Sequence, residues 1–225
     1  MGQEIKLGSI RAEASSRTAK GKKNTAVKDP KAVQARAVIT QNRLLAGART
    51  LFARSGFNQT GISDLLLETA TTRGALYHHF AGKTELFEAV FRLVAADLHD
   101  IGAKAAAPFS GDPWKQLLVA IDAHLKMVTS NEECQRILLI DGPAVLGWQR
   151  WREILSEYLL DGFVVTFEML MARKIIAEQP AGPLATLVMG ALHDASLAIA
   201  HAEDHVEAQV QFKAALISLI EGLRV

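Results

Sequence analysis

The sequence predicts an all-α protein of 225 residues. Apolar residues recur every three or four positions through most of the chain after Val38, which is the period of a helix with one buried face. No stretch alternates apolar and polar residues as a half-buried strand does. Glycine and proline gather between the periodic segments, most clearly at 141–143 and 180–183, where they end helices. With 49% hydrophobic and 22% charged residues, the chain has the composition of a folded protein.

The first 37 residues differ from the rest of the chain. They contain no aromatic residue, and nine Lys and Arg against three Asp and Glu give them a net charge of +6. Such a segment buries too little apolar surface to offset the entropy lost on ordering, so we predict a flexible basic arm over residues 1–37. The arm either contacts DNA phosphates or a minor groove, or is a tail without a binding role.

Three short helices are predicted within residues 38–83. Gly56 lies where the first needs a C-cap, Thr60 can N-cap the second, and Thr72 opens the third. Their apolar stripes are Leu44, Leu45, Ala48, Leu51 and Phe52; Ile62, Leu65 and Leu66; and Leu76 and Phe80. Because the last two helices are joined by a tight turn near Ala70, the segment is predicted to be a helix-turn-helix.

Residues 84–225 are predicted to form a second, larger helical domain. Its amphipathic segments, together with the helix that enters it, cover about 83–104, 114–128, 134–138, 151–170, 184–200 and 206–223. This domain carries eleven Lys and Arg against nineteen Asp and Glu, a net charge of −8, whereas residues 38–83 carry +3. A basic front end on an acidic body favours a polyanionic partner at that end.

Several protein classes are excluded by the same inventory. A single cysteine, Cys134, allows neither a disulfide framework nor a cysteine-based zinc site. No secretion signal opens the chain, and the longest uncharged apolar stretch, about 181–192, is shorter than a membrane helix requires. We therefore expect a soluble cytoplasmic protein that has no membrane segment.

The third short helix has the composition of a DNA reader. Its apolar side chains are separated from a face of small or hydrogen-bonding residues: Thr72, Arg73, Ala75, Tyr77 and His78. In a helix-turn-helix this face lies in the major groove, where polar side chains reach base edges and phosphates. An ordinary helical hairpin would show the same spacing, so the spacing alone leaves both interpretations open.

The residues of this region resemble a known family. The segments 51–53, 56–57 and 74–80, the last being Gly-Ala-Leu-Tyr-His-His-Phe, together with Thr60, Lys83 and Leu86-Phe87, are similar to the DNA-binding domain of TetR-family transcriptional regulators. The resemblance covers about residues 38–91. The segment 141–148 also resembles the C-terminal region of one subgroup of that family.

Two positions depart from the family pattern. Ala70 stands where the family usually has glycine and is followed by Thr71 in place of an apolar residue, which predicts a strained or reshaped turn. Gly82 replaces the serine that commonly caps the fourth helix, which predicts a weaker cap.

The resemblance implies roles for individual residues at the DNA. Arg73 would read a base, since a guanidinium can pair with guanine N7 and O6. Tyr77 and His78 would lie against the sugar-phosphate backbone, and Lys83 and Thr60 would bind phosphates. The full predicted DNA-binding set is Thr60, Ser63, Thr72, Arg73, Ala75, Tyr77, His78 and Lys83.

One module of this size reads only a few base pairs, so specificity requires two modules on a palindromic operator. The last two helices are the predicted homodimer surface, because they carry small and apolar residues on more than one face. The predicted interface comprises Leu184, Leu187, Val188, Ala191, Ala195, Val210, Leu216, Ile217 and Ile220. The alternative is that these helices only complete the core of one protomer.

The resemblance further implies a small-molecule pocket among the middle helices. Large apolar side chains with a few polar groups suit a hydrophobic effector. The candidate lining is Trp114, His124, Met127, Trp148, Trp151, Phe163, Phe167, Met171 and His193. Most such residues in a helical protein are core residues, so each is a candidate only.

The sequence thus predicts a ligand-responsive, DNA-binding transcriptional repressor rather than an enzyme. We expect no catalytic residue, no metal and no cofactor, and we expect double-stranded DNA, a small-molecule effector and a second copy of the chain as partners. Two rivals remain: an all-α enzyme or ligand-binding protein with a vestigial helix-turn-helix, and a DNA-binding protein without a ligand.

Overall fold

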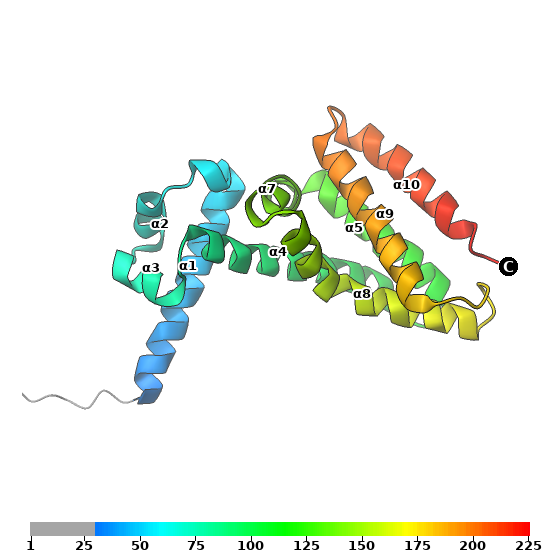
Figure 1. Cartoon of the computed structure of the whole chain (residues 1–225), viewed down its shortest axis with the longest axis horizontal. Coiled ribbons are helices and arrows are strands. Elements are labelled where there is room, and N and C mark those ends of the chain that lie inside the picture. The colour runs from blue at the N-terminus through cyan, green and yellow to red at the C-terminus, as the bar shows by residue number, and fades with distance from the viewer. Residues whose placement is uncertain (1–29) are drawn as a thin grey trace, which may run out of the picture.

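The computed structural model describes residues 30–225, and it confirms the all-α prediction, since no strand occurs in this part of the chain. The bounds of its α-helices are α1 Pro30–Gln59, α2 Ile62–Thr69, α3 Arg73–His79, α4 Lys83–Ala106, α5 Pro113–Ser130, α6 Glu132–Cys134, α7 Gly142–Leu146, α8 Trp148–Ala172, α9 Ala181–His201 and α10 His205–Glu221. A 3₁₀ turn, Ala107–Phe109, follows α4, and a π-helix, Gln135–Asp141, joins α6 to α7. Helices α1–α3 form one end of the molecule and α5, α8, α9 and α10 form the other, with α4 extending between them (Figure 1).

Helix α1 begins earlier than the sequence predicts. It starts at Pro30, so the last eight residues of the predicted flexible arm are helical, and residues 1–29 of that arm lie outside the described part. Proline is well placed there, because the first helical positions need no backbone donor. Gly56, with φ of 77°, interrupts the helix where a C-cap is predicted, and only glycine adopts this backbone conformation without strain.

A continuous core extends from the helix-turn-helix into the larger domain. Phe52, Phe57 and Phe87 pack edge-on or tilted, with ring centroids 5.2–5.9 Å apart, where α1 meets α4. Aromatic pairs at such spacings stabilise a core beyond the area that they bury. Because α4 supplies Phe87 here and packs against α5 further along, both ends of the molecule rest on one helix.

The segment after α5 is the largest departure from the predicted elements. The sequence predicts that Asp141-Gly142-Pro143 ends a short helix, but the chain passes through the π-helix and continues into α7 without leaving helical conformation. Proline is tolerated because it occupies the first turn of α7. The actual break is Gly147, whose φ is 79°.

Helix α9 is long and apolar enough by composition to cross a membrane, with a mean hydropathy of 1.4 over its most apolar window. It is nevertheless a core helix, because 56% of that window is buried within the protein, against α5, α8 and α10. Its apolar composition is accounted for by these contacts.

The turn of the helix-turn-helix is strained, as Ala70 in place of glycine predicts. Ala70 has φ of 48°, a left-handed conformation that costs a residue with a Cβ about 1–2 kcal/mol. We expect Ala70→Gly to raise the free energy of unfolding by roughly 0.5–1 kcal/mol, after subtraction of the entropy that glycine loses on folding. Urea unfolding measures the change. Ala46→Gly, at an exposed position inside α1, is the control and should destabilise by about 1 kcal/mol; equal losses in both variants would show that the turn is not strained.

Candidate DNA interface and effector cavity

The turn between α2 and α3 is held by local hydrogen bonds. The Thr71 amide donates to the Leu66 carbonyl at 3.2 Å, and the Thr69 and Thr71 hydroxyl oxygens lie 2.7 Å apart. Thr72, near which the sequence predicts the start of this helix, caps α3 by accepting from the Ala75 amide at 3.1 Å. The cap fixes the first turn of α3, which carries Arg73.

Helix α3 presents two distinct faces. Leu76 and Phe80 are buried, whereas Arg73, Tyr77 and His78 are exposed, and 48% of Tyr77 is accessible. Arg73 forms no hydrogen bond or ion pair with the described residues, so its guanidinium is available to an external partner. Thr72 and Ser63, at the start of α2, are also exposed, and Ala75 is half-buried. The exposed members of the predicted DNA-binding set therefore gather on and beside one short helix.

Two predicted phosphate ligands have other roles. Thr60 is 1% exposed and does not cap α2; Gly61 is the N-cap, and the Thr60 hydroxyl donates to the Gly56 carbonyl at 2.8 Å. The Lys83 ammonium donates to the carbonyls of Phe57 and Thr60, each at 2.9 Å, and lies 4.0 Å from the centre of the Phe57 ring. Both side chains bind the backbone around the kink in α1, and their binding of phosphates stays a prediction.

A set of polar contacts joins the helix-turn-helix to the larger domain. Arg49 of α1 donates to both carboxylate oxygens of Glu133 at 2.8 and 2.7 Å and pairs with Asp97 at 2.7 Å. The hydrogen bond to Glu133, followed by that to Asp97, holds the pKa of Arg49 above its ordinary value despite partial burial. At the end of the π-helix, the Asp141 carboxylate accepts from the Phe57 amide at 2.7 Å.

Asp141 makes this contact with the helix-turn-helix, and the neighbouring Gly142 packs within the larger domain. A Cβ on Gly142 would lie 2.7 Å from the Phe91 ring and 3.0 Å from both the Ile137 carbonyl and the Trp151 ring. Only glycine allows the π-helix to pack this closely against α4 and α8. The segment 141–148 therefore carries a contact between domains, a role that its sequence does not reveal.

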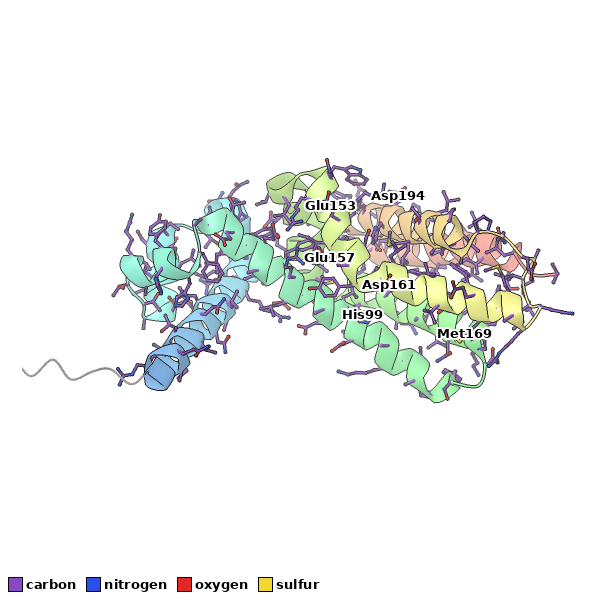
Figure 2. The ribbon with its side chains drawn as sticks, turned by 60° about the horizontal axis from the view of Figure 1, so that its bottom comes forward. His99, Glu153, Glu157, Asp161, Met169 and Asp194 are labelled. Atoms are coloured by element: carbon purple, nitrogen blue, oxygen red, sulfur yellow. The ribbon has the colours of Figure 1, made fainter. Side chains whose placement is uncertain are left out.

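A cavity of about 260 Å³ lies among α4, α5, α8 and α9. Its buried floor and more exposed rim are lined by Leu98, His99, Gly102, Ala103, Ala106, Gln116, Leu117, Ala120, Ile121, His124, Leu159, Gly162, Phe163, Thr166, Met169 and Leu192. Figure 2 shows His99 on α4 and Met169 on α8 along the line where these helices meet. The lining is mainly apolar, as small-molecule sites usually are.

Only two of the nine residues predicted to line the effector pocket line this cavity. His124 and Phe163 line it, whereas Trp114, Met127, Trp148, Trp151, Phe167, Met171 and His193 do not. Trp151 and Phe167 are fully buried core residues, and the Trp151 indole donates to the Leu138 carbonyl at 2.7 Å. The prediction favoured large aromatic residues, but large residues fill space, and the cavity remains where glycine and alanine leave room.

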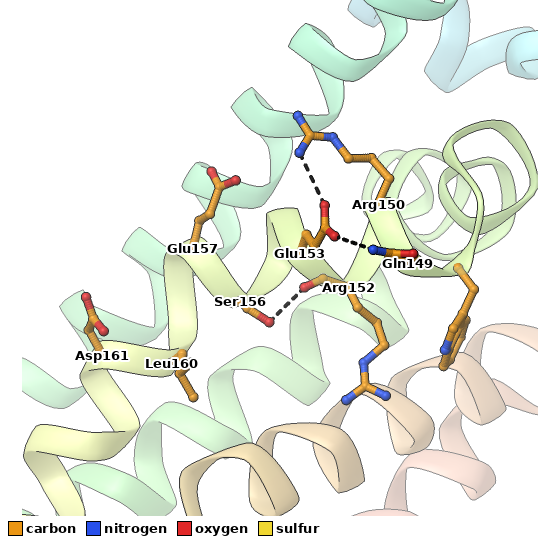
Figure 3. Close-up of a pocket in the computed structure, with 9 residues that line it drawn as sticks. Gln149, Arg150, Arg152, Glu153, Ser156, Glu157, Leu160 and Asp161 are labelled. Carbon is orange, nitrogen blue, oxygen red and sulfur yellow. Dashed lines mark hydrogen bonds and ion pairs between the residues drawn. The ribbon is translucent and has the colours of Figure 1, made fainter. Parts of the chain in front are cut away.

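Trp148 lies instead beside an open groove along α8, lined mainly by polar and charged residues (Figure 3). It is half exposed and stacks on Trp151, with ring centroids 4.9 Å apart. Arg150 pairs with Glu153 on this surface and, at 2.6 Å, with Glu88 of α4. Because its lining is mainly charged and polar, the groove is a weaker candidate for an apolar ligand than the smaller cavity.

Two histidines are buried in the larger domain. Burial lowers the pKa of His124 to about 3, and the neighbouring His193 adds to the effect. Burial, followed by the charge of Arg152, lowers the pKa of His193 to about 4. Both ring nitrogens of His193 are buried without a hydrogen-bond partner among the described residues. Both imidazoles are therefore neutral at pH 7.

The predicted dimer residues divide by exposure. Leu184, Val188, Ala195, Leu216 and Ile220 are at most 8% exposed and pack in the core of the protomer, so they offer little surface to a second copy. Leu187 is 72% exposed, Val210 is 56% exposed, and Ala191 and Ile217 are half-buried. Three further apolar residues of α10, which the sequence also places on the dimerisation helices, are exposed: Val206, Phe212 and Leu219.

Both parts of the chain match models of known protein families. The family model described as "Bacterial regulatory proteins, tetR family" matches residues 44–90, and "Tetracyclin repressor-like, C-terminal domain" matches residues 114–223. A solved TetR-family transcriptional regulator from Pectobacterium atrosepticum is 32% identical, with a TM-score of 0.77 over 85% of this chain and 97% of that one.

Curated relatives match over shorter segments. The HTH-type transcriptional regulator AcrR of Shigella flexneri is 31% identical over 44% of this chain and 46% of its own length. The HTH-type transcriptional repressor BepR of Brucella suis is 27% identical over 48% of this chain and 51% of its own length. The chain thus spans about half the length of these curated relatives. The two family models and the nearly complete match to the solved regulator show that this chain belongs to the TetR family of bacterial transcriptional regulators.

Proposed function

We propose that this protein is a homodimeric repressor that binds a palindromic operator and leaves it when a small molecule enters the cavity. The observation that carries the proposal is the exposed polar face of α3 on a helix-turn-helix clamped to a domain with an apolar cavity. We place the DNA-binding domain at residues 38–83, extended at its N-terminal side by the start of α1, and the regulatory domain at residues 84–225, and we expect the protein to act in the cytoplasm.

At the operator, α3 would lie in the major groove. Arg73 is proposed to read a base, with Tyr77 and His78 along the sugar-phosphate backbone. Ser63 and Thr72 are proposed to bind phosphates through their hydroxyls, and Ala75 is small enough to permit close approach. The exposure of these side chains supports the assignment, whereas Thr60 and Lys83, which bind backbone carbonyls, are placed second.

The second copy would pack on α9 and α10. Leu187, Val206, Val210, Phe212 and Leu219 are apolar side chains that are between 39% and 72% exposed on these two helices. On α10, helical spacing places Val206 and Val210 on one side and Phe212 and Leu219 on another, so the exposed apolar residues cover more than one face, and exposed apolar surface is typical of association. We define these five residues as the apolar ridge.

Release would require two states of the dimer with different affinities for the effector and for DNA. Helix α4 is the proposed lever, since it lines the cavity with Leu98 and Gly102 and begins beside α3 at Lys83. Asp97 of the same helix pairs with Arg49, and Asp141 of the π-helix accepts from the Phe57 amide. A shift of α4 would therefore displace the helix-turn-helix through these contacts.

The direct test is binding to duplex DNA from around the protein's own coding region, in a salt titration with excess random competitor. Tight, competitor-resistant binding to a palindrome is the expected result. Binding that only falls with salt and shows no sequence preference would contradict the repressor.

Arg73→Ala tests the proposed base contact. We expect operator affinity to fall by about 1–3 kcal/mol and sequence preference to relax at one base position, with little change on random DNA. Fluorescence anisotropy on operators varied at each position measures both quantities. Arg173→Ala removes an exposed arginine at the end of α8 and should leave the affinity unchanged. An equal loss on operator and random DNA would assign Arg73 to a phosphate instead.

A further inference from the structure

We infer that the cavity accepts an uncharged, mainly apolar molecule whose hydroxyl or N–H group donates a hydrogen bond to Nδ1 of His124. The inference names the effector class for the site in the proposed function and rests on that proposal. It follows from the hydrogen bonds of one buried histidine and from the composition of the walls around it.

The Ser196 hydroxyl determines which nitrogen of His124 carries the proton. Ser196 Oγ lies 2.8 Å from the Leu192 carbonyl and 3.1 Å from His124 Nε2. The two contacts can both be hydrogen bonds only if the single hydroxyl proton is donated to the Leu192 carbonyl, which has no proton to give. Ser196 Oγ must then accept from Nε2–H, and in a neutral imidazole this leaves Nδ1 as a lone-pair acceptor.

Nδ1 of His124 is available to a ligand. It forms no hydrogen bond within the described part of the chain. It also keeps some accessible surface, because it is not one of the fully buried polar atoms that lack a partner. His124 is 7% exposed and lines the cavity, from which we infer that the accessible edge of its ring faces that space. The cavity floor therefore offers an acceptor, and a ligand that brings a donor satisfies it.

The walls exclude charged ligands. Among the described residues, the lining contains no lysine, arginine, aspartate or glutamate. A carboxylate or an ammonium group in this cavity would lose its hydration without gaining a countercharge. His124 does not supply one at pH 7, because burial keeps its imidazole neutral.

The remaining polar groups leave the donor role to the ligand. The Thr166 hydroxyl already donates to the Gly162 carbonyl at 2.7 Å, and His99 and Gln116 are half-buried side chains at the more exposed part of the lining. The volume of about 260 Å³ is below the usual range for drug-sized ligands, roughly 300–1,000 Å³. A molecule with one or two rings and a single buried hydroxyl fits this description.

Four matched naphthalenes test the inference by isothermal titration calorimetry on the full chain at pH 7.5. They are 2-naphthol, its methyl ether, 2-naphthoate and 2-naphthylmethylammonium, which differ in donor capacity and charge on one apolar body. We expect 2-naphthol to bind at least tenfold more tightly than the ether, and neither ion to show measurable binding. Equal binding of naphthol and ether, tighter binding of an ion, or no binding of naphthol would overturn the inference.

Variants locate the binding at His124. His124→Leu should reduce naphthol affinity to that of the ether, and it leaves Ser196 satisfied through Leu192. His193→Leu, which replaces a second buried histidine outside the cavity, is the matched control and should retain the naphthol preference. Unchanged naphthol binding in folded His124→Leu would contradict the inference. Should that variant not fold, Ser196→Ala is the alternative test. It removes the acceptor of Nε2–H, so the proton of the imidazole can move to Nδ1. The difference in affinity between 2-naphthol and its methyl ether should then become smaller.

Binding and DNA release are measured separately, so the two proposals can fail independently. Naphthol that binds through His124 without releasing the operator would support the ligand class and contradict the effector step. An operator complex released only by a charged compound would support the regulator and overturn the ligand class.

Discussion

Replacing Leu187 and Val210 together by glutamate is expected to convert the protein to monomers and to abolish competitor-resistant operator binding. Both side chains are more than half exposed in the protomer, so the change should leave its fold intact. In the proposed dimer each glutamate would be buried without a partner charge, which costs several kcal/mol. A loss of about 2 kcal/mol at each of the two sites, as at interface hot spots, would raise the dimer dissociation constant several-hundredfold for the pair.

Sedimentation velocity at micromolar concentration measures the assembly, and operator anisotropy measures the binding. Leu93→Glu is the matched control, because it places the same charge at an apolar residue of α4 that is 41% exposed and outside the apolar ridge. That variant should remain dimeric. A double variant that stays dimeric would show that α9 and α10 do not form the interface, and monomers that keep full operator affinity would contradict the two-module recognition of DNA.

The sequence predicts helices better than it predicts surfaces. Periodicity finds α4, α5, α8, α9 and α10, and Gly56 is recognised as a helix end from its residue type alone. These features depend on neighbours along the chain, so they can be recognised without knowledge of the fold. The π-helix and α7 are missed because proline at the first turn of a helix looks the same as proline that ends one.

Residue roles that depend on tertiary contacts are predicted less well. Lys83 has the position of a phosphate ligand, but its ammonium meets two carbonyls that become neighbours only when α4 packs beside the end of α1. The apolar stripe of α9 predicts both burial and association, and only the packed structure separates buried Val188 from exposed Leu187. An amphipathic pattern does not say whether a face meets its own chain or a second one.

The cavity illustrates the same limit. Its walls include Gly102, Ala120 and Gly162, which sequence analysis passes over because small residues have no recognisable chemistry. His124 is identified as a candidate, but its tautomer depends on Ser196, which is 72 positions away in the sequence. The acceptor that defines the proposed ligand class is thus a property of the packed helices α5 and α9.

Lowering the pH from 7.5 to 5 is expected to reduce the free energy of unfolding by about 3–4 kcal/mol through His124 and His193 alone. Their pKa values in the folded protein are about 3 and about 4, against 6.5 for an unperturbed histidine. Below pH 6.5 these two imidazoles therefore bind protons in the unfolded chain but not in the folded protein. Each group then removes about 1.4 kcal/mol of stability per pH unit, until the pH reaches its folded pKa.

Urea unfolding at pH 7.5, 6.5, 5.5 and 5.0 measures this dependence. The window stays above the ordinary pKa values of Glu88 and Asp122, 4.5 and 3.8; these groups have pKa values lowered in the folded protein, so their own loss of stability occurs at lower pH. The double variant His124→Leu/His193→Leu should be less sensitive to pH by the full 3–4 kcal/mol, and each single variant by about half. A double variant as sensitive as the native protein would show that protons enter elsewhere.

The two single variants should also differ from one another. Leucine at position 193 removes a ring whose two nitrogens are buried without partners, so this variant should be more stable than the native protein even at pH 7.5. Leucine at position 124 instead breaks the hydrogen bond to Ser196 and should give no such gain. Operator binding by the two single variants then shows whether the unpartnered ring of His193 contributes to DNA binding.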